Sequence, residues 1–235
     1  MIDLHTHTLF SDGQLLPSEL VYRAKKKGYT AIGLTDHTDE SNLDFVIPRI
    51  VKISKILTKC YSIRVIPGCE LSYVPPELIQ KTAQKAKKLG AKLIIVHGET
   101  VSETVPPGTN LCAVKCKGLV DILAHPGVTS EKEVQLAKKN NVCLEITTRK
   151  NHLMTNRHVA ILSKKVGAKI IINTDTHSPE DLMSTELALT ILKNAGLSKQ
   201  DFLQMQKNAF DIIRRKSLNR GGDAKEMGKG RTQKR

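Results

Sequence analysis

Residues 1–8 read Met1-Ile-Asp-Leu-His-Thr-His-Thr8, an apolar run that ends in two histidines two residues apart. In a β-strand, residues i and i+2 point to the same face, so His5 and His7 can converge on one ion. Neutral imidazole nitrogens have the borderline softness that suits zinc, iron or manganese. The pair therefore predicts a metal site at the end of a first strand.

Six more apolar runs rich in Ile, Val and Leu follow, and segments with helical periodicity separate most of them. Strands that alternate with helices predict right-handed parallel βαβ units with helices outside the sheet. The aromatic content of 3%, with no Trp, indicates a core of Ile, Val, Leu and Ala, the usual filling of such a sheet. The seven predicted strands span residues 2–7, 31–35, 63–67, 92–96, 119–124, 142–146 and 169–172.

Residues 17–28 carry the start and stop signals of a helix, with Pro17 and Glu19 in the first turn, lysines in the last and a closing Gly28. Further helices are expected at residues 76–90, 110–117, 130–141, 179–194 and 198–216. The predicted domain spans residues 1–216. Residues 217–235 are rich in Gly and Lys without apolar periodicity, so we expect a basic, disordered tail.

Metal-binding residue types lie at or just beyond the ends of most of these runs, and six of the eight histidines occupy such positions. An open doubly wound sheet would concentrate its chemistry at one switch point beside a Gly-rich phosphate loop, yet neither GxGxxG nor GxxxxGK[ST] occurs. A closed α/β barrel brings many strand ends around one centre, so we predict a barrel. The residues concerned are His5, His7, Asp12, Asp36, His37, Glu70, His97, His125, Asp175 and His177.

The net charge of the 235-residue chain is +14. Six basic and two acidic residues from Ser217 onward account for +4, which leaves +10 on residues 1–216, enough to attract anionic substrates or nucleic acid. The start of the chain lacks a signal peptide, and no apolar stretch approaches the roughly 20 residues of a membrane span, so we expect a cytoplasmic protein without membrane attachment. The five cysteines are odd in number and irregularly spaced, which favours free thiols.

The series His-x-His, Thr-Asp-His, a strand-end Glu, Val-His-Gly, Ala-His-Pro-Gly and Asp-x-His-Ser resembles the PHP (polymerase and histidinol phosphatase) family. The resemblance covers residues 1–216 and is greatest to short stand-alone members of the histidinol-phosphatase-like type. It implies a distorted seven-stranded (β/α)7 barrel of the TIM type. It also implies a cluster of two or three divalent metals (Zn, Mn, Fe or Mg) that hydrolyses phosphoesters.

Many family members have His where this chain has Asp12, so a third metal site here has harder ligands that favour manganese, magnesium or iron over zinc. Asp36 and Asn173 are expected to orient ligands rather than bind metal. By motif position, the resemblance implies three sites: His5, His7, Glu70 and Asp175; Glu70, as a bridge, with His97 and His125; and Asp12, His37 and His177.

Two metals about 3.5–4 Å apart can bridge a water, lower its pKa toward about 7 and offset charge on the phosphoryl oxygens, so that the bridging hydroxide attacks in line. The expected catalytic residues are Glu70, Asp175 and His177, with His177 able to protonate the leaving alkoxide. Basic residues after the sixth strand are expected to bind the phosphate. They are Arg149, which is the first choice, then Lys150 and Arg157.

Two other functions compete with hydrolysis of a small phosphate monoester such as histidinol phosphate or a nucleotide. Metal-dependent amidohydrolases also begin a β/α barrel with His-x-His, but they usually add a bridging Lys where this chain has His97. A 3′-5′ exonuclease or other nucleic-acid phosphodiesterase is the second alternative, because the PHP fold also occurs as a nuclease domain in some DNA polymerases. The positive charge favours it, while the scarcity of aromatic residues and the lack of a polymerase domain disfavour it.

Overall fold

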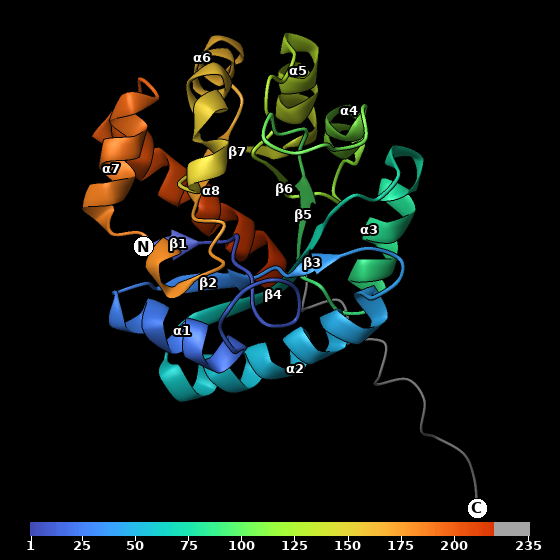
Figure 1. Ribbon diagram of the computed structural model, residues 1–235, viewed down its shortest axis with the longest axis vertical. Coiled ribbons are helices and arrows are strands. Elements are labelled where there is room, and N and C mark those ends of the chain that lie inside the picture. Colours follow the sequence, from blue (N-terminus) through green and yellow to red (C-terminus); the bar gives the residue numbers. More distant parts are fainter. Residues whose placement is uncertain (219–235) are drawn as a thin grey trace, which may run out of the picture.

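Seven parallel strands form the wall of the predicted α/β barrel, in the order β1-β2-β4-β5-β6-β7-β8, and β3 pairs with the far end of β4. The structure is a computed structural model and describes residues 1–218, so the tail prediction lies outside the described residues from residue 219 on (Figure 1). The strands are β1 (Ile2–Asp3), β2 (Ala31–Leu34), β3 (His37–Thr38), β4 (Arg64–Leu71), β5 (Leu93–His97), β6 (Ile122–Ala124), β7 (Cys143–Thr147) and β8 (Ile170–Asn173).

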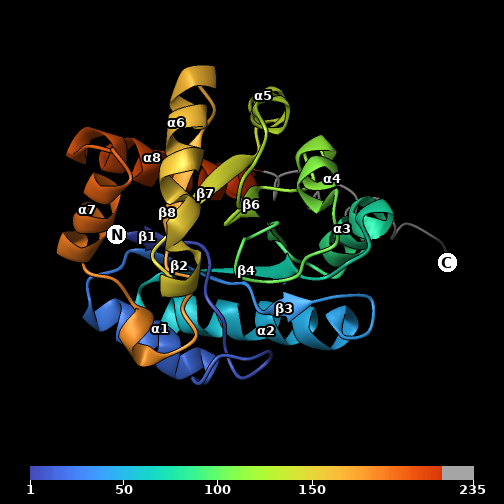
Figure 2. The same ribbon diagram turned by 45° about the horizontal axis from the view of Figure 1, so that its top comes forward.

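Helices surround the strands (Figures 1 and 2). The predicted helices are present, and the structure adds two that the sequence analysis did not identify, α2 and α6. Along α2 the buried residues Leu43, Val46, Ile47 and Ile50 recur three or four apart, which is the spacing of a helix with one face on the core. The helices are α1 (Pro17–Lys26), α2 (Leu43–Tyr61), α3 (Ile79–Lys88), α4 (Thr109–Lys115), α5 (Glu131–Asn140), α6 (Asn156–Val166), α7 (Thr185–Asn194) and α8 (Lys199–Leu218), with 3-10 turns η1 (Pro76–Leu78), η2 (Lys150–Thr155) and η3 (Pro179–Asp181).

The segments that follow β1 and β8 bring the two outer strands together and nearly close the barrel. Thr6 and Thr176 form a parallel bridge, and the backbone N–H of His7 donates to the carbonyl of Thr176 at 2.8 Å. The N–H of Asp175 donates to the carbonyl of His5 at 3.0 Å. The backbones of His5, His7 and Asp175, which are candidate metal ligands, therefore also make the hydrogen bonds that close the barrel.

The third predicted strand is longer than expected, since β4 continues past Pro67 to Leu71. Pairing between β4 and β5 begins only at Gly68, so the N–H that Pro67 lacks costs no ladder bond. A side chain at residue 68 would press on the backbone of Leu93, which explains the glycine. As a consequence, Glu70 lies inside a strand, between β3 and β5, rather than in the loop after it.

The barrel interior is apolar at the amino ends of the strands. Leu4, Ile66, Leu93, Ile95 and Ile122 are buried there in one cluster with apolar residues of α8. Helix α8 crosses behind β7 and β8 and covers this end of the barrel (Figure 2). Because α8 covers the amino ends, the polar residues of the barrel lie at the carboxyl ends of the strands.

Among residues 1–218, no helix combines the length and the apolar character needed to cross a lipid bilayer.

We predict that Asp3, which joins β1 to the segment after β8, makes stability fall as the pH rises from about 4 to about 6. Burial raises the pKa of its carboxyl to about 6, although Thr174 and the His5 N–H donate to it. The folded protein therefore holds this proton more tightly than the unfolded chain does. The free energy of unfolding should fall by about 3 kcal/mol as the pH rises through this range, because the folded state then loses its bound proton.

Urea unfolding of the wild type and the Asp3→Asn variant from pH 4 to pH 7, with chelator present, tests this. The variant should lack that part of the decline, and equal pH slopes for the two proteins would contradict the assignment.

Candidate metal centre

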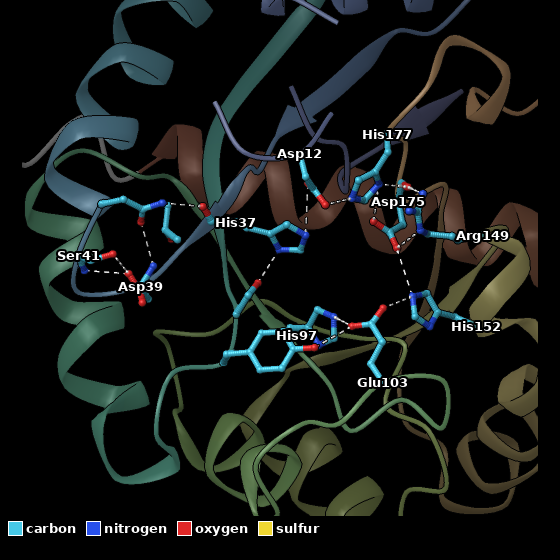
Figure 3. A pocket seen from close by; sticks show the side chains of 14 residues that line it. Asp12, His37, Asp39, Ser41, His97, Glu103, Arg149, His152, Asp175 and His177 are labelled. Carbon is cyan, nitrogen blue, oxygen red and sulfur yellow. Dashed lines mark hydrogen bonds and ion pairs between the residues drawn. The ribbon is translucent and has the colours of Figure 1, made fainter. Parts of the chain in front are cut away.

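Nine side chains converge at the carboxyl ends of the strands, and the sequence analysis proposed all nine as metal ligands. His5 and His7 follow β1, Glu70 lies in β4, and Asp175 follows β8. Figure 3 shows the exposed side of the group, where Asp12 and His177 approach each other across the mouth of the barrel. We call the nine residues the ligand cluster: His5, His7, Asp12, His37, Glu70, His97, His125, Asp175 and His177.

The Glu70 carboxylate lies at the centre of the ligand cluster and is fully buried. Its Oε1 atom is 3.3 Å from His5 Nε2 and 3.7 Å from His125 Nε2. Its Oε2 atom is 2.8 Å from His37 Nδ1 and 3.6 Å from His7 Nε2. Four imidazoles from three segments thus surround one carboxylate, so that both of its oxygens could hold a cation.

Candidate ligand atoms gather in several overlapping sets, each compact enough to surround one ion. Asp175 belongs to one of them and lies beside another, because its Oδ2 is 3.8 Å from His125 Nε2 and its Oδ1 is 3.1 Å from His7 Nε2. The sets are His5, His7 and Glu70; Glu70, His97 and His125; His7, Asp12, His37 and His177; His5, His125 and Glu145; and His125, His152 and Asp175.

Several buried polar atoms of the ligand cluster lack a hydrogen-bond partner within the described chain. They include both carboxylate oxygens of Glu70 and Oδ1 of Asp175, as well as Nδ1 of His7 and of His125. Buried polar atoms are nearly always hydrogen-bonded in folded proteins, so such a concentration is unusual. Histidine nitrogens and carboxylate oxygens are also the donor set that zinc, manganese and iron accept. The residues present therefore fit divalent cations.

Neighbouring charges shift the pKa values of the cluster in opposite directions. Burial lowers the pKa of the His5 imidazole, but Glu145, Glu70 and Asp175 outweigh it and raise that pKa well above its usual value. Burial, together with the charge on His37, lowers the pKa of His7 well below its usual value. Bound cations would replace the shared protons of such a group, so metal affinity falls as the pH is lowered.

Glu145 is the main support behind the ligand cluster. Its Oε1 accepts hydrogen bonds from His5 Nδ1 at 2.9 Å and Asn173 Nδ2 at 2.8 Å, and its Oε2 accepts from the His125 N–H at 3.1 Å. This arrangement fixes the His5 ring with Nε2 toward Glu70. Asn173, which was predicted to orient a ligand, therefore acts on His5 through Glu145. The position of Glu145 at a strand end can be read from the sequence, but its support of His5 cannot.

Asp36 supports a different part of the site from the one expected. We predicted that it orients a ligand, with His37 as the neighbouring candidate, but its Oδ1 accepts from the Thr8 N–H at 2.7 Å, from the Thr8 hydroxyl at 2.8 Å and from Ser11 Oγ at 3.0 Å. The segment it holds joins His7 to Asp12. Asp36 thus positions the loop that carries two ligands.

A cavity of about 460 Å³ opens over the ligand cluster, lined by 14 residues (Figure 3). Arg149 lines it, with Nε 3.5 Å from Asp175 Oδ2 and one terminal nitrogen 3.7 Å from Asp181 Oδ2. Lys150 and Arg157, the other cations predicted to bind phosphate, are not among the lining residues. Arg157 lies at a separate depression with Leu153 and Ile191, because helix α6 begins at Asn156 and turns it away.

The lining also includes two ionisable residues that were not predicted from the sequence, His152 and Glu103. His152 lies in η2 and Glu103 in the loop between β5 and α4, so neither follows a strand directly. The strand-end criterion therefore passed over them. In the structure, His152 is buried and stacks on His125 with ring centroids 4.3 Å apart.

Residues 3–142 match the family model of the PHP domain. An uncharacterized protein from Methanocaldococcus jannaschii is 46% identical over 200 residues, which cover 85% of this chain and 91% of that protein. A probable phosphatase from Thermoanaerobacter sp. is 25% identical over 241 residues, covering 95% of this chain and 98% of that protein. Among solved structures, a chain of archaeal ribonuclease P with mature tRNA superimposes with a TM-score of 0.71 at 17% identity, covering 93% of this chain and 92% of that one, which shows a shared fold.

We expect Glu145→Gln to weaken metal binding by about 10- to 100-fold, the usual cost of removing a carboxylate that orients a metal-binding histidine. The amide cannot accept from His5 Nδ1 and from the His125 N–H at once, so one donor is left unpaired. Calorimetric titration of Zn²⁺ or Mn²⁺ into chelator-stripped protein measures the effect. Glu19→Gln, an exposed change in α1, is the control, and wild-type affinity in Glu145→Gln would refute the role.

Proposed function

This chain belongs to the PHP domain family, and on that premise we propose that it is a metal-dependent phosphatase that hydrolyses phosphate monoesters. The observation that carries the proposal is the Glu70 carboxylate, which is buried and has an imidazole nitrogen as close as 2.8 Å, although neither of its oxygens has the geometry of a hydrogen bond within residues 1–218. The 25% identical relative named a probable phosphatase supports the same class of reaction. Two or three divalent cations of the Zn, Mn, Fe or Mg type would be held by the nine residues of the ligand cluster.

Cations at such a site supply a nucleophile at neutral pH, by lowering the pKa of water, and neutralise charge on the phosphoryl oxygens. The chain itself supplies the remaining functions. Glu70 and Asp175 hold the centre together as shared carboxylates, so we propose them as catalytic residues. If the set of Asp12, His37 and His177 holds no cation, His177 Nε2, which lies 3.1 Å from Asp12 Oδ2 at the mouth of the cavity, can protonate the leaving oxygen. Arg149, whose Nε lies 3.5 Å from Asp175 Oδ2, would bind a phosphoryl oxygen beside the same carboxylate.

The charge of the cavity favours a small monoester over a nucleic acid. Arg149 is the one Lys or Arg among the 14 lining residues, whereas Asp12, Asp39, Glu103 and Asp175 are acidic. A nucleic-acid backbone requires several cations along its path, since each phosphate contact is electrostatic. The positive charge of the chain therefore lies mostly away from the cavity.

A nucleic-acid phosphodiesterase of the 3′-5′ exonuclease type is the second candidate, because the net charge is +14 and the fold occurs in a complex with tRNA. Amidohydrolysis is the third candidate. It is disfavoured because this chain has His97 at the position where amidohydrolases usually have a bridging lysine. Assays of phosphate release from monoesters, of nucleotide release from single-stranded DNA and of ammonia release separate the three. Histidinol phosphate and nucleoside monophosphates belong in the monoester panel.

Glu70→Gln should abolish phosphatase activity on an aryl phosphate in buffer that contains Mn²⁺ or Zn²⁺, while the far-UV circular dichroism stays unchanged. Chelation should likewise remove the wild-type activity, and added metal should restore it. Glu77→Gln, an exposed change in η1, is the matched control and should retain full activity. Activity that persists in Glu70→Gln, or that ignores the chelator, would refute the proposed function.

A further inference from the structure

The wall of the cavity formed by η2 carries a buried histidine, His152, that the proposed reaction does not use. Its side chain is 2% exposed and stacks on His125 with ring planes 20° apart. Contacts on both ring nitrogens fix its orientation. With both ring nitrogens in contact, the direction in which Nε2 points into the cavity is set.

Two hydroxyl groups hold the inner nitrogen of this ring. His152 Nδ1 lies 2.7 Å from Thr100 Oγ1 and 2.8 Å from Ser102 Oγ, both from the loop after β5. A hydroxyl can donate or accept, whereas the carboxylates near Nε2 can only accept, so they favour the neutral tautomer with its proton on Nε2, and a hydroxyl then donates to Nδ1. The Nε2 atom faces the cavity, so it presents a hydrogen-bond donor there.

The acceptors around His152 Nε2 are carboxylates. Glu103 Oε1 is 3.5 Å away and Asp175 Oδ2 is 3.9 Å away. Arg149 Nε is 3.5 Å from the same Asp175 oxygen, so both donors approach one carboxylate of the ligand cluster (Figure 3). The two donors therefore lie on the same side of the cavity, next to the cluster.

The Glu103 carboxylate shows how this wall receives an anion. It reaches in from the loop between β5 and α4, where its Oε2 accepts from Tyr73 Oη at 3.2 Å and lies 3.2 Å from the ligand His97, and its Oε1 lies near the donor His152 Nε2. The Glu103 side chain is 37% exposed, so solvent reaches it. An anion from solvent can compete for the same donors.

We propose that His152, paired with Arg149, forms a phosphate subsite on the η2 wall, in which His152 Nε2 donates to a phosphoryl oxygen and the phosphate takes the place of the Glu103 carboxylate. The subsite rests on the proposed function, since it would orient a phosphate monoester dianion against the ligand cluster. Thr100 is a positioning residue within it, because its hydroxyl contacts Nδ1 at 2.7 Å and holds the ring with Nε2 toward the cavity.

The test measures binding of inorganic phosphate to the metal-loaded protein by calorimetry, together with its metal content by mass spectrometry. His152→Ala should weaken phosphate binding by about 10- to 100-fold, the cost of a hydrogen bond to a charged group, while the metal content stays at the wild-type level. His152→Gln, which retains a side-chain N–H, should recover part of the loss. His158→Gln is the matched control, since His158 donates to the Thr129 carbonyl outside the cavity and should bind phosphate normally.

The positioning role has its own pair of variants. Thr100→Val should weaken phosphate binding by a few-fold, and Thr100→Ser should restore it, because the hydroxyl alone distinguishes them in this role. Equal binding by the two variants would overturn the role of Thr100.

Unchanged phosphate affinity in His152→Ala would overturn the subsite. Loss of bound metal in the same variant would also overturn it, because His152 would then be a ligand, as its place near His125 and Asp175 allows. The phosphate arm needs no turnover. A wild type that binds phosphate through His152 but hydrolyses no monoester would therefore refute the proposed function and leave the subsite in place.

Discussion

The burial of the Glu70 carboxylate among imidazoles is the constraint on which the rest of this structure depends. An ionised carboxylate removed from water is stable only when charged or polar partners surround it. Those partners come from the ends of several strands, including His5, His37 and His125. A flat sheet would spread these strand ends along one edge, whereas a closed barrel arranges them in a ring around a single point.

Closure of the barrel and assembly of the site use the same hydrogen bonds. The His5 carbonyl accepts a hydrogen bond from the Asp175 N–H, and the His7 N–H donates to the Thr176 carbonyl. The two segments that close the barrel therefore also place the ligands His5 and His7 beside the ligands Asp175 and His177. Glu145 reaches across from β7 to hold His5 and the backbone of His125. The stability of the closed barrel and the geometry of the ligand cluster are therefore hard to change independently.

Charge is distributed unevenly in this protein, and the distribution bears on its substrate. The chain carries a net charge of +14, yet its cavity is lined by four carboxylates and a single cation, Arg149. Bound cations would supply the positive charge that the lining lacks, and they would place it at the point of reaction. Under the proposed function, Arg149 and His152 would then orient the phosphate, and the acidic residues of the lining would disfavour a long polyanion.

The sequence predicted the barrel and, through the motifs that resemble the PHP family, the nine members of the ligand cluster, because the carboxyl ends of strands in a parallel barrel meet at one place. Asp12 is the exception, since the loop that Asp36 holds brings it there. It did not determine the length of β4, since Pro67 resembles a strand end and only the pairing with β5 shows that its missing N–H is harmless. Nor did it identify His152 and Glu103, whose approach to the cavity depends on how η2 and the loop after β5 fold over the strand ends. Periodicity and strand-end position are local properties that a sequence carries, whereas the side chains that cover the site from loops are placed by packing between segments far apart in the chain.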